Sequence, residues 1–106
     1  MDAPRSGGVY TSRPTYAEGD WGDTQGISTS QLRNGLVTTI DNSNGATLAR
    51  GSYSYIDSQT ISLDYVSIGK ATRVKANCRL VTPSEMNCTR ADGAQFKLVR
   101  RGGTFG

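Results

Sequence analysis

The sequence contains no histidine among its 106 residues and only two cysteines. Without an imidazole the chain lacks the commonest general base, cannot build a Ser-His-Asp or Cys-His nucleophilic site, and lacks the ligand of most zinc sites. Two cysteines without further ligands do not make a metal finger, and the glycines form no GxxxxGK[ST] phosphate-binding loop. We therefore expect no catalytic residue, no metal site and no cofactor.

Carboxylates are also few, and they lie mainly where turns are expected. One pair is a catalytic candidate, because Asp20 and Asp23 flank Trp21 and two carboxylates beside an aromatic ring are able to hydrolyse glycosides. Exposed strand edges are a much commoner setting for such residues. The sequence therefore favours a protein that is not an enzyme.

Long hydrophobic runs are missing as well. No apolar stretch approaches the ~18–20 residues that a membrane-spanning helix needs, and residues 1–16 contain no apolar core of a signal peptide. That segment is rich in glycine, proline, serine and threonine, which predicts a flexible N-terminal leader at 1–16 and a single domain at 17–106. Met1 is then expected to be an artificial start on a trimmed mature chain.

Charge is present but unevenly distributed. Residues 1–64 carry a net charge of −3 and residues 65–106 a net charge of +6, so the overall +3 hides a basic C-terminal half. A basic half favours an anionic partner such as nucleic acid, phospholipid or lipopolysaccharide. A solvated strand face is the simpler interpretation.

Alternation of apolar and polar residues predicts β-strands after Tyr16 and no helix. The expected strands are residues 18–23, 26–33, 36–40, 47–56, 60–68 and 72–81, followed by two strands around the second cysteine and Phe96. Asn34-Gly35 is the strongest hairpin signal among the turns between them. About eight short sequential strands close most economically into a small antiparallel meander barrel, lipocalin-like, with a β-sandwich as the alternative. Such a barrel holds at most one small ligand.

The faces of two expected strands can be read from the alternation. In residues 36–40, Leu36, Thr38 and Ile40 share one face. In residues 72–81 the apolar side chains face one way and a basic stripe faces the other. With one lysine from the last strand, this stripe gives the candidate residues for binding an anionic surface: Arg73, Lys75, Arg79 and Lys97.

The two cysteines lie symmetrically about Pro83. If the chain reverses there, Cys78 faces Cys88, and directly opposed Cβ atoms lie ~4.5–5.5 Å apart. A non-hydrogen-bonded pair at the short end of that range is bridged by a disulfide with little adjustment. A three-residue turn at 91–93 forms the next hairpin, and its register independently puts the same residues on the inner face. We therefore predict a Cys78–Cys88 disulfide and an oxidising compartment, with two buried free thiols as the alternative.

The aromatic residues are expected to serve packing. Trp21 is predicted to plug one mouth of the barrel rather than to contact a ligand. Tyr53, Tyr55 and Tyr65 are predicted to be packing residues rather than a stacking platform for bases. Nucleic acid is therefore not an expected partner.

Several short motifs follow one another in a fixed order along the chain. They are Gly-x-Trp (19–21), Asn-Gly (34–35), Gly-x-Tyr-x-Tyr (51–55), Asn-Cys-x-Leu-Val (77–81), Met-Asn-Cys-Thr (86–89) and Gly-x-x-Phe-x-Leu-x-Arg-Arg (93–101). In this order and spacing they resemble the small outer-membrane lipoproteins of alphaproteobacteria, the minor lipoprotein antigens. The resemblance extends over essentially all of the chain beyond the leader.

This resemblance implies a secreted precursor whose N-terminal mature cysteine is lipidated and anchored in the outer membrane. The chain has no such cysteine, so we expect it upstream of Met1. The family implies no defined activity, which leaves a structural or interaction role in the cell envelope, with an envelope protein or lipopolysaccharide as partner.

Two other functions stay open. Gly-x-Trp and the cysteine hairpin are also similar to lipocalin-like inhibitors of bacterial metalloproteases, whose extended N-terminal segment enters the protease cleft. Residues 1–16 would take that part here. The third hypothesis is a carrier of a small apolar or anionic lipid ligand.

Overall fold

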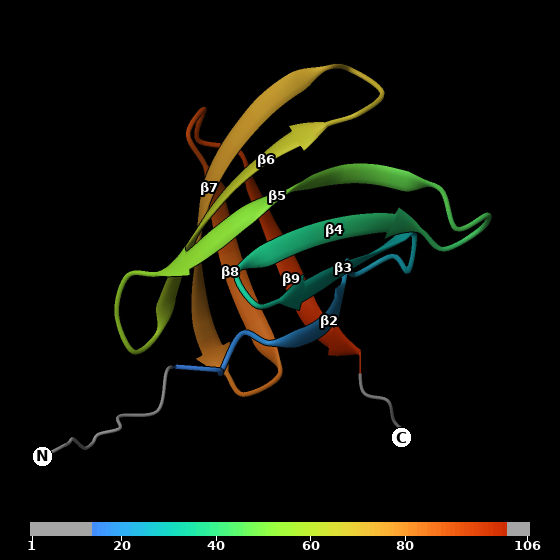
Figure 1. Ribbon diagram of the computed structural model, residues 1–106. Coiled ribbons are helices and arrows are strands. Elements are labelled where there is room, and N and C mark those ends of the chain that lie inside the picture. The colour runs from blue at the N-terminus through green and yellow to red at the C-terminus, as the bar shows by residue number, and fades with distance from the viewer. Residues whose placement is uncertain (1–13, 102–106) are drawn as a thin grey trace, which may run out of the picture.

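The computed structural model describes residues 14–101, which form an all-β closed barrel (Figure 1). Its strands are β2 (Gly19–Gly22), β3 (Ser28–Arg33), β4 (Leu36–Asp41), β5 (Thr47–Tyr55), β6 (Thr60–Ser67), β7 (Thr72–Thr82), β8 (Glu85–Arg90) and β9 (Gln95–Arg101). Each strand pairs antiparallel with the next, and β9 returns to β2. The predicted meander barrel is confirmed, and the β-sandwich alternative is wrong. Within this described range no helix is able to cross a membrane.

Of the predicted leader, only Pro14, Thr15 and Tyr16 fall within the described residues. The Tyr16 ring packs edge-to-face on Tyr55 with 4.8 Å between ring centroids, and its hydroxyl donates to the Asp57 carbonyl at 2.9 Å. The chain is therefore in contact with the barrel from Tyr16 onward. The predictions of a leader and of an inhibitory N-terminal segment otherwise concern residues that lie outside the described range.

The tight turns form where their residues tolerate positive φ. Asn34 and Gly35 have φ of 54° and 83°, the conformation that a two-residue hairpin turn requires. Gly93 has φ 92° in the predicted three-residue turn. That turn is closed by hydrogen bonds from the Gly93 N–H to the Arg90 carbonyl and from the Arg90 N–H to the Ala94 carbonyl. These local preferences fix the register of the strands on either side.

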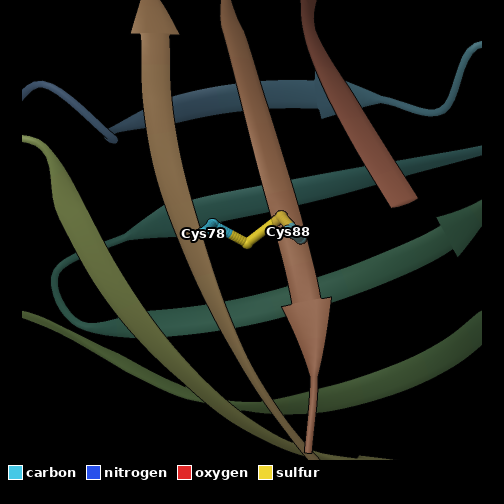
Figure 2. Close-up of a disulfide and its surroundings, with 2 residues drawn as sticks. All are labelled: Cys78 and Cys88. Carbon is cyan, nitrogen blue, oxygen red and sulfur yellow. A yellow bond between two sulfur atoms is a disulfide. The ribbon is translucent and has the colours of Figure 1, made fainter. Parts of the chain in front are cut away.

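The β7–β8 hairpin brings the two cysteines directly opposite each other. A disulfide joins Cys78 to Cys88 (Figure 2), and their Cα atoms are 3.9 Å apart. Both side chains are buried in the barrel. The predicted disulfide is confirmed, and on the other side of β8 Cys88 lies opposite Phe96 of β9.

The inner faces of the strands enclose one apolar core. Its largest fully buried side chains are Trp21, Leu32, Ile61, Met86 and the two disulfide cysteines. Gly51 is needed in β5 because a Cβ there would collide with the backbone of Asp64 and Tyr65 on β6. Leu36, Thr38 and Ile40 share the outer rather than the inner face, since Val37 is the β4 residue buried in the core.

One end of the barrel is closed by the segment that enters β2. The Trp21 indole N–H donates to the Ala17 carbonyl at 2.9 Å, and both residues are fully buried. Arg100 from β9 lies over the indole, with its guanidinium carbon 4.3 Å from the ring centroid. It donates to the carbonyls of Tyr16 and Glu18 at 2.6 and 2.8 Å. Trp21 is therefore the plug that the sequence predicted, and Arg100 fastens the segment above it.

The opposite end is more open because β2 is short. The β2–β9 ladder contains only three residue pairs, which match Asp20–Gly22 with Val99–Arg101. Residues 95–98 of β9 therefore have no β2 residue beside them. The turns after β2, β4, β6 and β8 lie at this end, since successive antiparallel strands alternate in direction (Figure 1).

Candidate functional site

The predicted basic stripe lies on the outer face of the barrel. Arg79 on β7 is opposite Asn87 on β8, and Asn87 is opposite Lys97 on β9, so Arg79 and Lys97 belong to one row across three strands. Arg73 and Lys75 lie farther along β7 toward the open end. The structure therefore divides the four candidate residues into two groups.

Two of these four cations are neutralised by carboxylates on neighbouring strands. Arg73 makes two hydrogen bonds to Asp64, both at 2.8 Å, and they hold the pKa of the Asp64 carboxyl below its usual value. Lys97 forms an ion pair with Glu85 at 2.8 Å. Arg79 and Lys75 form no ion pair with another residue of the described range. The stripe is thus less positive than the sequence of β7 suggests.

An exposed aliphatic patch adjoins the stripe, and the sequence analysis missed it. It consists of Leu48 on β5 with Val66 and Ile68 on and just after β6, with exposed fractions of 38%, 42% and 46%. The Ile68 N–H donates to the Leu48 carbonyl at 2.8 Å, which sets these two residues side by side. The alternation of β6 contains the signal, because Ile61, Leu63 and Tyr65 face inward and Val66 must then face outward.

Cations surround this aliphatic patch. Val66 is opposite Arg50 on β5 and opposite Arg73 on β7. Lys70 follows Ile68 by two residues in the β6–β7 turn. The outer face near the open end therefore combines apolar side chains with a positively charged rim.

The two carboxylates that flank Trp21 have separate local partners. Asp20 forms an ion pair with Arg33 at 2.7 Å. The Asp23 carboxylate accepts hydrogen bonds from the backbone N–H groups of Gln25 and Ile27, at 3.2 and 2.8 Å, and so closes the turn after β2. Both carboxylates are thus engaged in local structure.

The most perturbed carboxyl also belongs to a turn. Hydrogen bonds from the Arg90 guanidinium and from the Ala94 N–H lower the pKa of Asp92 to about 2. Among residues 14–101 no group of three or more Cys, Asp or Glu side chains is placed to hold a metal ion.

These features define the class of protein: a small disulfide-stapled meander barrel with a packed core and a charged outer face. The chain belongs to the outer membrane lipoprotein Omp10 family, whose model matches residues 18–99. Members of this family are lipid-anchored in the bacterial outer membrane, and this is the location of the chain. The predicted resemblance to alphaproteobacterial outer-membrane lipoproteins is thereby confirmed.

Named relatives are similar in sequence along most of the chain. An outer membrane lipoprotein omp10 from Brucella melitensis is 36% identical over 93 residues, which cover 88% of this chain and 73% of the relative. A homologue from Rhizobium meliloti is 37% identical over 101 residues, covering 93% of this chain and 82% of the relative. Among solved structures, a redesigned β-barrel has a TM-score of 0.63 at 16% identity and covers 84% of this chain and 95% of its own. That likeness shows the fold alone.

Proposed function

We propose that this chain is a non-enzymatic interaction domain, held at the outer membrane by a lipid anchor, whose outer β5–β7 face contacts anionic envelope lipid. The observation that carries the proposal is the aliphatic patch of Leu48, Val66 and Ile68, with Arg50 and Lys70 beside it and Arg73 paired to Asp64 at its edge. Apolar side chains beside cations suit a surface of acyl chains beneath anionic head groups.

The expected strength of this contact fits a tethered domain. Each lysine or arginine near an anionic membrane contributes about 1 kcal/mol, and further burial of a half-exposed aliphatic side chain contributes about as much. Such a contact is weak for a freely diffusing protein. A lipid anchor raises the local concentration of the domain at the membrane, so a weak contact suffices.

Vesicle binding of residues 1–106 tests the proposal. We expect binding to vesicles that contain phosphatidylglycerol or lipopolysaccharide, little binding to phosphatidylcholine vesicles, and a steep loss of binding with added salt. A difference between the two anionic vesicles identifies which lipid is preferred. Binding that ignores both salt and head-group charge would leave the basic rim as solubilising surface and overturn the proposal.

Matched variants locate the contact. V66S/I68S and R50E change the aliphatic patch and its rim, and each is expected to weaken binding about tenfold or more. I56S/V81S is the control, because it removes two aliphatic side chains of similar exposure, 54% and 47%, elsewhere on the barrel. Equal loss in V66S/I68S and in the control would place the contact somewhere else.

A further inference from the structure

The open end of the barrel contains a partly open cavity of about 180 Å³. Apolar side chains from opposite walls line it: Leu32, Val37, Ala49, Leu63, Phe96 and Leu98. Polar side chains line it as well: the hydroxyl groups of Ser28, Ser30 and Thr39, and the Asp23 carboxylate, which accepts backbone hydrogen bonds in the turn after β2. The cavity is therefore an apolar chamber inside the barrel with a polar rim.

The short β2 explains why the chamber is there. Its four residues leave the first part of β9, including Phe96 and Leu98, without a neighbour on the β2 side. A longer β2 would bring another inward side chain into this space. The chamber is therefore a property of the strand lengths and does not depend on a loosely packed core.

A second hollow of about 400 Å³ adjoins the chamber, and Ala49 and Tyr65 line both. The second hollow is strongly basic. Its charged lining residues are the cations Lys70, Arg73, Lys75 and Arg90 and a single carboxylate, Asp92.

These cations are not equally engaged. Arg90 is held by Asp92 at 2.6 Å, and Arg73 is held by Asp64 from outside the hollow. Lys70 and Lys75 form no ion pair with any residue between 14 and 101. An anionic group in the hollow would thus meet two lysines without having to displace a carboxylate from them.

We propose that these two hollows form one binding site for an amphiphile with a short, single alkyl chain and an anionic head group. The chain occupies the 180 Å³ chamber, and the head group lies in the basic hollow beside Lys70 and Lys75. The chamber is smaller than the ~300–1,000 Å³ of typical ligand pockets, so only a short chain fits. The site shares Leu48, Lys70 and Arg73 with the proposed membrane contact, but it would bind a dissolved molecule in the absence of vesicles, so the two proposals can fail separately.

Straight-chain carboxylates from hexanoate to dodecanoate provide the test, measured by titration calorimetry below their micelle concentrations. Affinity is expected to rise about fourfold per methylene group while the chain still enters the chamber, and to level off once the chamber is filled. The corresponding alkylammonium ions are expected to bind at least tenfold more weakly. Equal binding of carboxylate and ammonium, or no binding at millimolar concentration, would overturn the proposal.

Variants and methyl resonances connect any binding to this site. K75E is expected to weaken octanoate binding about tenfold, whereas R79E, with the same charge change four residues away on β7, changes it less than twofold. A49L, which fills the junction of the two hollows, is expected to abolish binding, with circular dichroism as the check that it folds.

Octanoate should shift the methyl resonances of Leu63 and Leu98 and leave that of Leu36 unchanged. Equal effects of K75E and R79E, or shifts confined to outer residues, would contradict the proposed site.

Discussion

At the scale of single residues, two tyrosines on β5 differ in the hydrogen bonding of their hydroxyl groups. Tyr53 and Tyr55 both face inward, with ring centroids 5.8 Å apart in an edge-to-face arrangement. The Tyr55 hydroxyl accepts a hydrogen bond from the Ala17 N–H at 3.3 Å. The Tyr53 hydroxyl is buried and has no hydrogen-bond partner among the described residues. Burying a hydroxyl without a partner costs about 1–3 kcal/mol.

The two hydroxyls therefore predict opposite effects for the same substitution. Y53F is expected to raise the free energy of unfolding by up to about 1 kcal/mol, because it removes a buried polar atom that gains nothing from burial. Y55F is expected to lower it by about 0.5–1.5 kcal/mol, because the Ala17 N–H loses its acceptor. Urea denaturation measures both. Loss of stability in Y53F as large as in Y55F would mean that the Tyr53 hydroxyl is hydrogen-bonded in solution.

At the scale of elements, the β7–β8 hairpin is the unit that the sequence determines most completely. Its turn at Pro83 pairs Thr82 with Glu85, and a register shift between Leu80 and Thr82 then brings Cys78 opposite Cys88. The disulfide joins two residues that are separated by 10 positions in the sequence. By loop entropy such a bridge contributes roughly 2–3 kcal/mol, part of which is lost if the reduced hairpin keeps residual structure.

Reduction of the disulfide is therefore expected to lower the melting temperature by several degrees without abolishing the fold. Thermal denaturation with and without dithiothreitol, followed by far-ultraviolet circular dichroism, measures the shift. Mass spectrometry of the non-reduced protein should find it two hydrogens lighter than the reduced chain. Free thiols in protein freshly prepared from an oxidising compartment, or a melting temperature that reduction leaves unchanged, would refute the stabilising role.

Other elements could be predicted only in part, because their faces depend on partner strands. The alternation of β4 shows that Leu36 and Val37 lie on opposite faces, but both are apolar, and only pairing with Leu32 and Gly51 turns Val37 inward. The basic stripe of β7 was visible in the sequence. The pairing of Arg73 with Asp64 was not, because Asp64 lies on β6 and only the β6–β7 register brings it near Arg73.

The candidate site shows the same limit. The aliphatic patch forms only when the β5–β6 register brings its residues together. The chamber depends on how far β2 extends along β9. Neither feature can be predicted from a single strand. Trp21 was recognisable as a plug because a large aromatic side chain in so small a domain has few other places to go. The role of Arg100 was hidden, because its partners lie 82 and 84 residues earlier in the chain.

At the scale of the whole molecule, that arginine connects segments from both ends of the chain. Arg100 donates to the carbonyls of Tyr16, Glu18 and, at 3.1 Å, Pro83, and it also covers Trp21. It thus joins the segment before β2, the β7–β8 turn and the core. Three pairs of residues are all that the β2–β9 ladder contributes beside it.

R100A is expected to lower the free energy of unfolding by roughly 2–4 kcal/mol, since it leaves partly buried carbonyls without donors and uncovers the indole. R101A is the matched control, because the neighbouring Arg101 is exposed and its side chain makes one hydrogen bond within residues 14–101, to the Asp23 carbonyl at 3.1 Å. Its expected effect is below about 0.5 kcal/mol. Chemical denaturation compares the two, and equal effects would remove Arg100 from its role in closing the barrel.

The β2–β9 seam also sets an order of events in time. Every other strand pair joins neighbours in the sequence, whereas the seam joins the two ends of the meander and must bear the entropy of closing nearly the whole chain. We therefore expect the hairpins from β3 to β9 to form first and the seam last. Pulse-labelling hydrogen exchange during refolding should protect the amides of β6 and β7 before those of β2, and the reverse order would disprove this sequence. Until the seam forms, the folding chain is an open curved sheet whose apolar face is accessible to chaperones and to other unfolded chains.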